Sequence, residues 1–355
     1  MRLMGPPFLG PDRESAYFLS INRNKKSVAL DLETPEGREV FHDLCRVSDV
    51  VWENFRPGVM ARLGCAPETL RQLNPRLVVC SISAFGQEGP YREWPAFDLA
   101  LQTMGGAMSL TGEAGRPPAR MGLPMGDLAG GMFGALAVAS ALFRRAQTGE
   151  GVHFDLSLLD CQVSLLTYVA QYFWADGRVP GRVGSGHASV VPYQAFATRD
   201  GYVVVAVFAE KFWAGFCRAI ERSDLAADAR FDSNPKRVEH REELVPVLGA
   251  ILAARPTAEW LARLQREGVP VAPIHTVDQV VTDPQVLLRE MVVDLEHPTL
   301  GTVSTLGTPV KVDGAPPFRP APPPGLGEDT DPVLRELLGY PPERIDTLRQ
   351  RRVIA

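Results

Sequence analysis

The sequence predicts an α/β protein, with a doubly wound, mostly parallel sheet in a large domain and a smaller α+β domain inserted into it. Three observations lead to this fold class. Strand and helix patterns alternate between residues 27 and 175, which is typical of a parallel sheet. Residues 76–83 (RLVVCSIS) are almost continuously apolar, as expected for a strand buried on both faces. From residue 191 the pattern changes to a hairpin followed by helices.

The elements of the large domain follow from local signals. Residues 1–15 are expected to form a loop, and residues 17–22 a short ordered stretch. Thr34 is expected to cap a helix because Pro35 follows at the first helical position. The expected strands are 27–32, 49–53, 76–83 and 152–156, and the expected helices are 34–46, 57–63, 67–73, 97–109, 128–145 and 160–175.

The smaller domain begins after a glycine-rich linker. Residues 193–198 and 202–207 flank a turn at Asp200-Gly201, which predicts a β-hairpin. Helices are expected at 211–221, 235–254 and 257–267, an extended piece at 270–274, strands at 291–297 and 301–306, a Pro-rich connector at 315–325 and a helix at 329–338. The predicted division is a large domain (1–175), a linker (176–190), a small domain (191–285) and a C-terminal segment (286–355) that returns to the large domain.

Composition narrows the class of protein. The chain has 355 residues, of which 45% are hydrophobic and 22% charged, as in a folded protein. The net charge of −5 argues against nucleic acid as a partner. The longest uncharged run, 128–143, is shorter than the about 20 residues of a membrane span and is interpreted as a buried helix. The first ten residues lack the apolar core of a signal peptide, so we expect a cytoplasmic protein without a membrane partner.

Cysteine and histidine usage gives no sign of a metal site or a disulfide framework. The five cysteines are odd in number and contain no C-x-x-C, so each is expected to be reduced and buried. The six histidines are scattered and show no metal-ligand spacing, so no metal is expected. The sequence also lacks a G-x-G-x-x-G after a strand and a P-loop motif, and no permanently bound cofactor is expected.

The segment MGDLAGG (125–131) is the strongest candidate for chemistry. Asp127 precedes a helix of small residues, and the free N–H groups and positive dipole end at a helix start are expected to keep its carboxylate ionised. The glycines beside it allow a ligand to approach closely. An ionised, accessible aspartate of this kind can act as a covalent nucleophile. The structural alternative is a plain N-cap.

Other candidates have equally simple structural alternatives. Asp98 also lies near a helix start, and it becomes interesting only if it converges with Asp127. His187 lies in a glycine-rich stretch that is either a lid or a passive linker. Basic residues near strand ends can hold phosphates through charged donors or simply form a solvated rim; these are Arg23, Lys25, Lys26, Arg56 and Arg62.

Taken together, the segments resemble the class III coenzyme A transferases. This family also contains formyl-CoA transferase, carnitine CoA-transferase and α-methylacyl-CoA racemase. The resemblance runs almost from end to end. It is carried by NRNKKSVALDLETPEG (22–37), VVWENFRPGVMARLG (50–64), LNPRLVVCSISAFGQEGP (73–90), FDLALQTMGG (97–106), MGDLAGGMFGAL (125–136), TGEGVHFDLSLLD (148–160), VPYQAFATRDGY (191–202) and LGEDTDPVLRELLGY (326–340).

The resemblance implies an acyl-CoA:carboxylate CoA-transferase with a Rossmann-like large domain that forms an interlaced homodimer. Asp127 matches the family's nucleophilic aspartate, which carries CoA as a covalent aspartyl thioester, and Asp98 matches an acidic position beside it. The substrates implied are an acyl-CoA and a small organic acid. The positions that match CoA contacts are Leu30, Asp31, Leu32, Glu33, Asn54, Phe55, Arg56, Arg62, Trp94, Pro95, Ala96 and Phe97.

Two departures from the family pattern keep alternatives open. Racemases of the family have a histidine base where this chain has Phe97, and a phenyl ring cannot take a proton. Glu210 matches a racemase glutamate, but transferase is preferred over racemase or epimerase. Family members also begin with an additional strand and helix, which this sequence is expected to lack. The third interpretation is therefore a truncated CoA-binding protein without catalysis.

Overall fold

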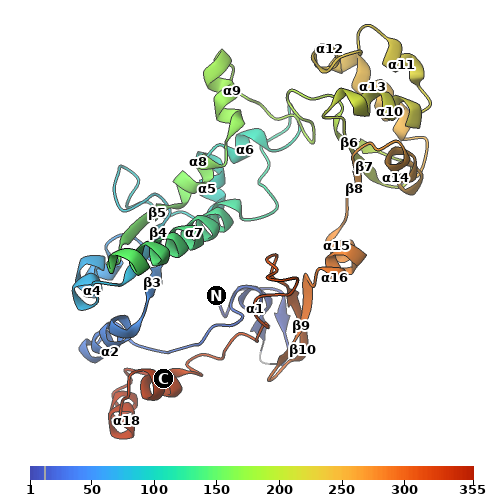
Figure 1. Ribbon diagram of the computed structural model, residues 1–355. Coiled ribbons are helices and arrows are strands. Elements are labelled where there is room, and N and C mark those ends of the chain that lie inside the picture. Colours follow the sequence, from blue (N-terminus) through green and yellow to red (C-terminus); the bar gives the residue numbers. More distant parts are fainter. Residues whose placement is uncertain (12) are drawn as a thin grey trace. The chain divides into compact units, whose positions relative to one another are not determined.

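A parallel sheet lies at the centre of the large part of the chain. The structure is a computed structural model, and it describes residues 1–11 and 13–355 (Figure 1). In these residues the sheet has the order β3 (Val50–Glu53), β4 (Val78–Ser83), β5 (His153–Ser157). Both pairs are parallel, and all residues of β4 are buried, as its apolar run predicted. The mixed α/β class with a parallel sheet is confirmed.

Helices cover both faces of this sheet. α2 (Pro35–Val47), α3 (Val59–Arg62) and α4 (Pro67–Leu73) pack on the face of Val51 and Val79 through a buried apolar cluster. α7 (Met125–Thr148) packs on the opposite face, where a Cβ added to Gly134 would lie 2.7 Å from the Trp52 ring. Neighbouring residues of a strand point to opposite faces, so Val51 and Trp52 separate the two helix layers.

The start of α2 agrees with its sequence signal, but the strand expected before it is absent. The Thr34 hydroxyl accepts a hydrogen bond from Gly37 N–H at 3.0 Å, and Pro35 is the first helical residue. Residues 27–32 were expected to be a strand. Only Leu30 takes part in an isolated bridge, to Ile354, and Asp31 N–H donates to the Val353 carbonyl at 2.8 Å. The prediction was wrong because the only strand partner comes from the other end of the chain.

Three expected helices are each divided in two. The helix expected at 97–109 is α5 (Asp98–Met104) and α6 (Ala107–Leu110), separated at Gly106, whose φ of 86° is left-handed. The helix expected at 160–175 is α8 (Leu158–Ser164) and α9 (Tyr168–Asp176), separated at Thr167 with φ 44°. The helix expected at 235–254 is α12 (Asn234–Glu239) and α13 (Arg241–Leu252). A positive φ ends the α-helical hydrogen-bond ladder, which explains the first two breaks.

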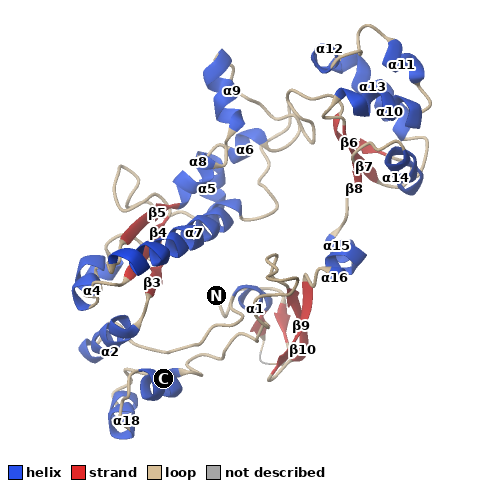
Figure 2. Ribbon diagram, in the orientation of Figure 1, coloured by secondary structure: helices blue, strands red, loops and turns tan. Residues whose placement is uncertain are grey.

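The terminal segments add short elements (Figure 2). The expected strands near residues 291–306 are the antiparallel pair β9 (Val292–His297) and β10 (Gly301–Leu306). The helix expected at 329–338 is α17 (Thr330–Pro332) continued by the π-helix η1 (Val333–Leu337). The remaining elements are β1 (Phe8–Leu9), β2 (Glu14–Ser15), α1 (Ala16–Ile21), α15 (Val277–Thr282), α16 (Pro284–Leu288) and α18 (Pro342–Gln350).

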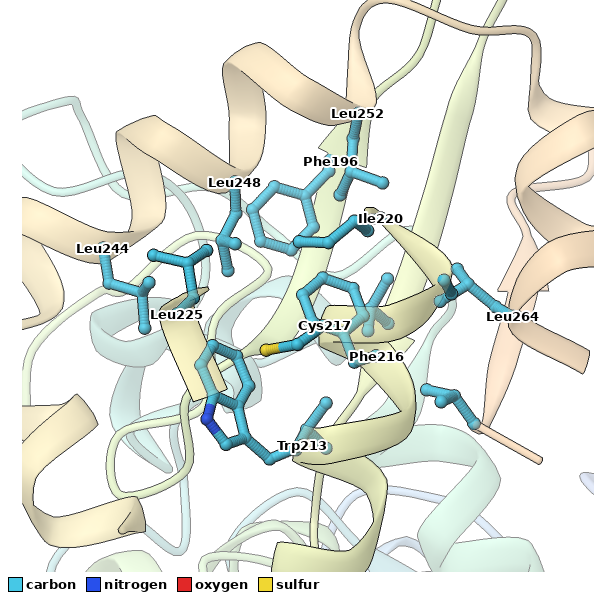
Figure 3. Close-up of a cluster of buried hydrophobic side chains, with 14 of the residues drawn as sticks. Phe196, Trp213, Phe216, Cys217, Ile220, Leu225, Leu244, Leu248, Leu252 and Leu264 are labelled. Carbon is cyan, nitrogen blue, oxygen red and sulfur yellow. The ribbon is translucent and has the colours of Figure 1, made fainter. Parts of the chain in front are cut away.

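The expected hairpin forms an antiparallel sheet with its own core. β6 (Tyr193–Ala197) pairs with β7 (Tyr202–Ala206), which also pairs with β8 (Val271–Pro273). The helices of this part are α10 (Glu210–Ala219), α11 (Ser223–Ala227), α12, α13 and α14 (Thr257–Arg266). Their inner faces enclose Phe196, Trp213, Phe216 and a set of leucines that are almost fully buried (Figure 3).

The chain divides into two compact units. One consists of Met1–Leu101, Pro124–Ser164 and Asp278–Ala355, and the other of Gln102–Leu123 and Leu165–Val277. The second unit contains the hairpin domain together with α6, α9 and the residues around them. The predicted domain boundaries stay a prediction.

Two expectations about burial have different outcomes. All five cysteines are free and buried, as predicted. The apolar run at 128–143 was expected to be buried, and this is wrong, because Leu128, Met132, Leu136 and Phe143 are 45–71% exposed on α7. Length and apolar composition alone would let α7 cross a membrane, as would the bent pair α13 and α14 taken as one span. One face of α7 packs closely on the sheet, whereas its apolar side chains at these four positions are exposed.

Candidate active site

Asp127 lies in the first turn of α7 and not at its N-cap. The helix begins two residues earlier than predicted, at Met125, and Pro124 is the cap residue. The Asp127 side chain is exposed, and its carboxylate has no hydrogen bond or ion pair with any residue that the structure describes. A carboxylate at this place remains available to an external reactant.

Asp98 converges with Asp127 at the start of α7. Asp98 is the first residue of α5, and its Oδ1 accepts a hydrogen bond from Gly126 N–H at 2.8 Å. A Cβ added to Gly126 would lie 3.1 Å from the same oxygen, so glycine is the residue that permits this close contact. The two acids therefore flank one peptide group, which meets the condition that made Asp98 of interest.

The environment raises the pKa of Asp127. Loss of hydration is the larger cause, and the negative charge of Asp98 is the second. These two effects oppose the helix dipole, which favours the ionised carboxylate, so the expectation that the helix start keeps Asp127 ionised stays a prediction. Asp127 is consequently more basic than an ordinary aspartate.

The residues expected to contact CoA near position 30 form a loop held by the chain's C-terminal residues. Besides the contacts of Leu30 and Asp31 with residues 353–354, the Asp31 carboxylate accepts from Glu33 N–H at 2.9 Å. Leu32 is half-buried, whereas Asp31 and Glu33 are exposed. The segment 30–33 is thus a loop that turns at residues 32–33 and has accessible polar groups before α2.

A second group of expected CoA contacts follows β3. Asn54 Nδ2 donates to the Ile82 carbonyl at 2.7 Å, which ties this loop to the end of β4. Phe55 N–H donates to the Glu53 carboxylate at 2.7 Å. The side chains of Arg56 and Arg62 are exposed and make no hydrogen bond or ion pair to any described residue. Both guanidinium groups are available to an anionic ligand.

The loop between β4 and α5 contains an aromatic cluster that the sequence analysis did not single out. The rings of Tyr91 and Trp94 lie 4.4 Å apart, and Phe85 contacts both edge-on. Trp94 is 53% exposed, and the expected contact residues Pro95, Ala96 and Phe97 follow it. Aromatic residues spaced along FGQEGPYREW were the signal for such a cluster. The cluster offers a partly exposed, flat apolar surface in this loop.

Glu210 is occupied by a buried arginine in the hairpin unit. Arg237 has no exposed side-chain surface and donates to both Glu210 oxygens, at 2.9 and 3.1 Å. Asn234 N–H donates to the same carboxylate at 2.7 Å. Burial alone would raise the pKa of Glu210, but these hydrogen bonds and the Arg237 charge lower it. A carboxylate held in this way is a poor proton acceptor. Glu210, the residue that matches the racemase glutamate, is therefore part of an ion pair in this structure.

His187 lies in a connector that is anchored by side chains of α12 and α13. Arg241 donates to the carbonyls of His187 and Ala188, and Asn234 donates to the Ser189 carbonyl. The His187 Nδ1 accepts from Ser189 N–H at 3.1 Å, and its ring stacks on Tyr168. His187 and Glu210 belong to one unit, and Asp127 and Asp98 belong to the other.

Neither the apolar cavity nor the metal-ligating side chains of the described residues suggest a second site. A cavity of about 500 Å3 is lined by apolar residues such as Leu19, Leu295 and Val303, and none of the predicted site residues lines it. Among the described residues, no group of three or more His, Cys, Asp or Glu side chains is placed to hold a metal ion. The convergence of Asp98 and Asp127 is therefore the candidate active site.

Comparison with known proteins defines the class. The model of the CoA-transferase family III matches residues 1–330. Succinyl-CoA:glutarate CoA-transferase of Mus musculus is 37% identical over 347 residues, covering 98% of this chain and 79% of that protein. Acetyl-CoA:oxalate CoA-transferase of Acetobacter aceti is 37% identical over 309 residues, covering 87% and 78%. The chain belongs to CoA-transferase family III and is a transferase.

A solved structure agrees with this assignment. The crystal structure of a CAIB/BAIF family protein from Brucella suis matches the fold with a TM-score of 0.84 at 37% identity, covering 95% of this chain and 88% of that chain. The predicted family and the prediction of a transferase are confirmed.

Proposed function

We propose that this protein transfers CoA from an acyl-CoA thioester to a small dicarboxylic acid, with Asp127 as the covalent nucleophile. The Asp127 carboxylate attacks the thioester carbonyl, forming a mixed anhydride and releasing the CoA thiolate. The thiolate then attacks the aspartyl carbonyl, which gives an Asp127–CoA thioester and frees the donor acid. Each step breaks one acyl bond and forms another, so no external oxidant or reductant is needed. Dividing one transfer into two easier steps is the advantage of covalent catalysis.

The second half of the reaction reverses these steps with the acceptor. The acceptor carboxylate attacks the Asp127–CoA thioester and forms a new anhydride, and the released thiolate attacks the acceptor's acyl carbon. The products are the new acyl-CoA and the regenerated Asp127 carboxylate. Dicarboxylic acceptors are proposed because the relatives above are named for glutarate and oxalate.

The observation that carries the proposal is the free Asp127 carboxylate beside Asp98 at the start of α7. It is exposed, it makes no hydrogen bond or ion pair to any described residue, and its pKa is raised, which makes the ionised form a stronger base. A carboxylate that is engaged in an ion pair would have to give up its partner before attacking. Asp98 is proposed to act beside it by holding the Gly126 peptide.

The CoA moiety is proposed to bind along segments that flank the sheet in the same unit. Arg56 and Arg62 would hold phosphate groups through charged donors. Trp94 would offer its exposed face to the adenine ring, with Tyr91 packed behind it. Segment 30–33, Asn54, Phe55 and residues 95–97 complete the proposed contacts. CoA is a substrate in this scheme, and no permanently bound cofactor takes part.

Racemisation is a weaker candidate. Phe97 is 86% exposed and supplies no base, and Glu210 is held by Arg237 and Asn234. Exchange of the α-hydrogen of an acyl-CoA with deuterated solvent, in the absence of any acceptor acid, is the measurement that would favour it over transfer.

The proposal also covers the oligomeric state, the fold of the large domain and the cellular location. We propose a homodimer, supported by the exposed apolar face of α7. A doubly wound, Rossmann-like large domain is supported by helices on both faces of the parallel strands. A cytoplasmic location is also proposed.

The decisive experiment is to trap the intermediate on Asp127. The full chain is incubated with succinyl-CoA, quenched with hydroxylamine or borohydride and digested for mass spectrometry. We expect a modified Asp127 in the wild type and none in Asp127→Asn, which keeps the side-chain shape. An unmodified Asp127 under turnover conditions, or full transfer activity in Asp127→Asn, would contradict the mechanism.

A further inference from the structure

A buried glutamine on α5 holds the segment of chain that leads into α7. Gln102 has no exposed surface. Its Oε1 accepts a hydrogen bond from Met121 N–H at 2.9 Å, and its Nε2 donates to the Leu123 carbonyl at 3.2 Å. One side-chain amide therefore binds a backbone donor and a backbone acceptor of the same short segment. Pro124, the cap residue of α7, follows directly.

The same helix also holds the first turn of α7. Gln102 follows Asp98 by four residues on α5, and residues four apart lie on one face of a helix. Asp98 accepts from Gly126 N–H, so α5 contacts the chain at Met121, at Leu123 and again at Gly126. We propose that Gln102 is a positioning residue that holds residues 121–123, the chain that leads directly into Pro124 and the first turn of α7, and that Asp127 depends on this hold through the continuous chain.

This segment depends on side-chain contacts because it has little regular structure of its own. Residues 111–124 form neither helix nor strand, and most of residues 113–120 are exposed. A side-chain amide is neutral and offers both donors and an acceptor, so one glutamine can satisfy an N–H and a carbonyl of the same segment. Displacement of a reacting group by about 1 Å can reduce a rate by about a hundredfold. The contacts of Gln102 therefore bear on catalysis although it touches no reacting atom.

The consequence for catalysis rests on the proposed function, but the positioning itself can be measured without turnover. Gln102→Met removes both hydrogen bonds at nearly constant volume. Gln102→Glu keeps an acceptor for Met121 N–H and loses the donor to Leu123. Thr198→Val is the matched control, because it removes a part-buried side-chain hydrogen bond, to the Thr257 hydroxyl of α14 at 2.7 Å, that is distant along the chain from the contacts of Gln102.

Amide hydrogen exchange of peptides covering residues 119–127 is measured for the four proteins, together with carbodiimide labelling of Asp127 against pH. In Gln102→Met we expect at least tenfold faster exchange in this segment. We also expect a labelling midpoint at lower pH, because a loosened helix start hydrates Asp127 and moves it from Asp98. Gln102→Glu should lie between Gln102→Met and wild type. Thr198→Val should match wild type in both measurements.

Kinetics supply the readout that a purely structural residue would not change. We expect Gln102→Met to lower kcat about 10- to 100-fold while KM for succinyl-CoA changes less than twofold. If the wild type forms no Asp127 adduct, the proposed function fails, and exchange and labelling still decide the role of Gln102. The inference is overturned if Gln102→Met exchanges residues 119–127 at the wild-type rate and keeps the wild-type labelling midpoint. If Gln102→Met does not fold, the same two results in Gln102→Glu overturn it.

Discussion

Two kinds of local effect act in opposite directions on the pKa of Asp127. The positive end of α7 favours the ionised carboxylate, whereas lost hydration and the Asp98 charge favour the protonated form, and the pKa is raised as a result. Perturbed groups of this kind are typical of functional sites. The same balance makes the site sensitive to pH, since only the ionised form can attack a thioester.

Replacing Asp98 by asparagine tests this balance. Asp98→Asn removes the negative charge but keeps an oxygen that can accept from Gly126 N–H. Without the repulsive charge the pKa of Asp127 falls, so the rise of adduct formation with pH should shift to lower pH. Single-turnover adduct formation measured across pH checks this. Glu150→Gln, just beyond the other end of α7, should leave the profile unchanged, and an unshifted midpoint in Asp98→Asn would refute the coupling.

Arg62 tests the proposed phosphate contacts. A hydrogen bond to a charged group contributes about 1.5–3 kcal/mol, so Arg62→Ala should raise KM for acyl-CoA roughly 10- to 150-fold. The KM for the acceptor acid should change little, because the acceptor makes no use of this site. Steady-state kinetics measure both constants. Arg289→Ala is the control, because it removes another exposed arginine whose side chain makes no hydrogen bond or ion pair to any described residue. Equal effects of the two variants would exclude Arg62 from the CoA site.

At the scale of elements, the close approach of two segments depends on Gly151. A Cβ at this position would lie 2.0 Å from the Leu77 carbonyl oxygen, next to β4. Gly151→Ala should therefore lower the free energy of unfolding by about 1–3 kcal/mol, the usual cost of overpacking. The matched variant Gly249→Ala in α13 meets no atom within 4 Å and should gain about 0.5–1 kcal/mol from helix propensity. Urea denaturation of both proteins gives the comparison, and equal stabilities would contradict the argument.

Elements with a strong local signal could be predicted from the sequence, and elements that depend on distant residues could not. β4 was predictable from its continuous apolar run, and α2 from Thr34 and Pro35. The extended segment at residues 27–32 lacks a sheet because its partner is Ile354, which no local pattern announces. The break between α8 and α9 occurs at Thr167, which has a positive φ. A positive φ is usually signalled in a sequence by glycine, so this break could not be predicted.

In the candidate site, too, features with a local signal could be predicted and features that depend on distant residues could not. Asp127 and Asp98 could be singled out because each lies at the start of an expected helix, and their convergence required the fold. The direction of the Asp127 pKa could not be predicted, since it depends on hydration and on the distance to Asp98. Gln102 carried no signal of its own, because glutamine in a helix is ordinarily a solvent-facing residue.

At the scale of the whole molecule, the exposed face of α7 is the feature that a single chain leaves unexplained. Leu128, Met132, Leu136 and Phe143 are exposed on a helix whose other face packs on the sheet. The first three are four residues apart, so they form one stripe along the helix. Contiguous exposed apolar surface usually marks an interface between proteins. A second copy of this chain is the partner that we propose.

The prediction at this scale is that charge on the stripe separates the proposed dimer. Leu136 is 65% exposed and Met132 is 62% exposed, so an aspartate at either position is tolerated by the single chain but would be buried unpaired in an interface. The double variant Met132→Asp, Leu136→Asp should sediment at half the mass of the wild type while keeping its far-ultraviolet circular dichroism. Leu288→Asp, at a 78% exposed position on α16, is the matched control and should keep the wild-type mass. A monomeric wild type, or a double variant with unchanged mass, would show that the α7 stripe is not the dimer contact. Transfer activity measured on the same samples would then tell whether the site at Asp127 needs the second chain.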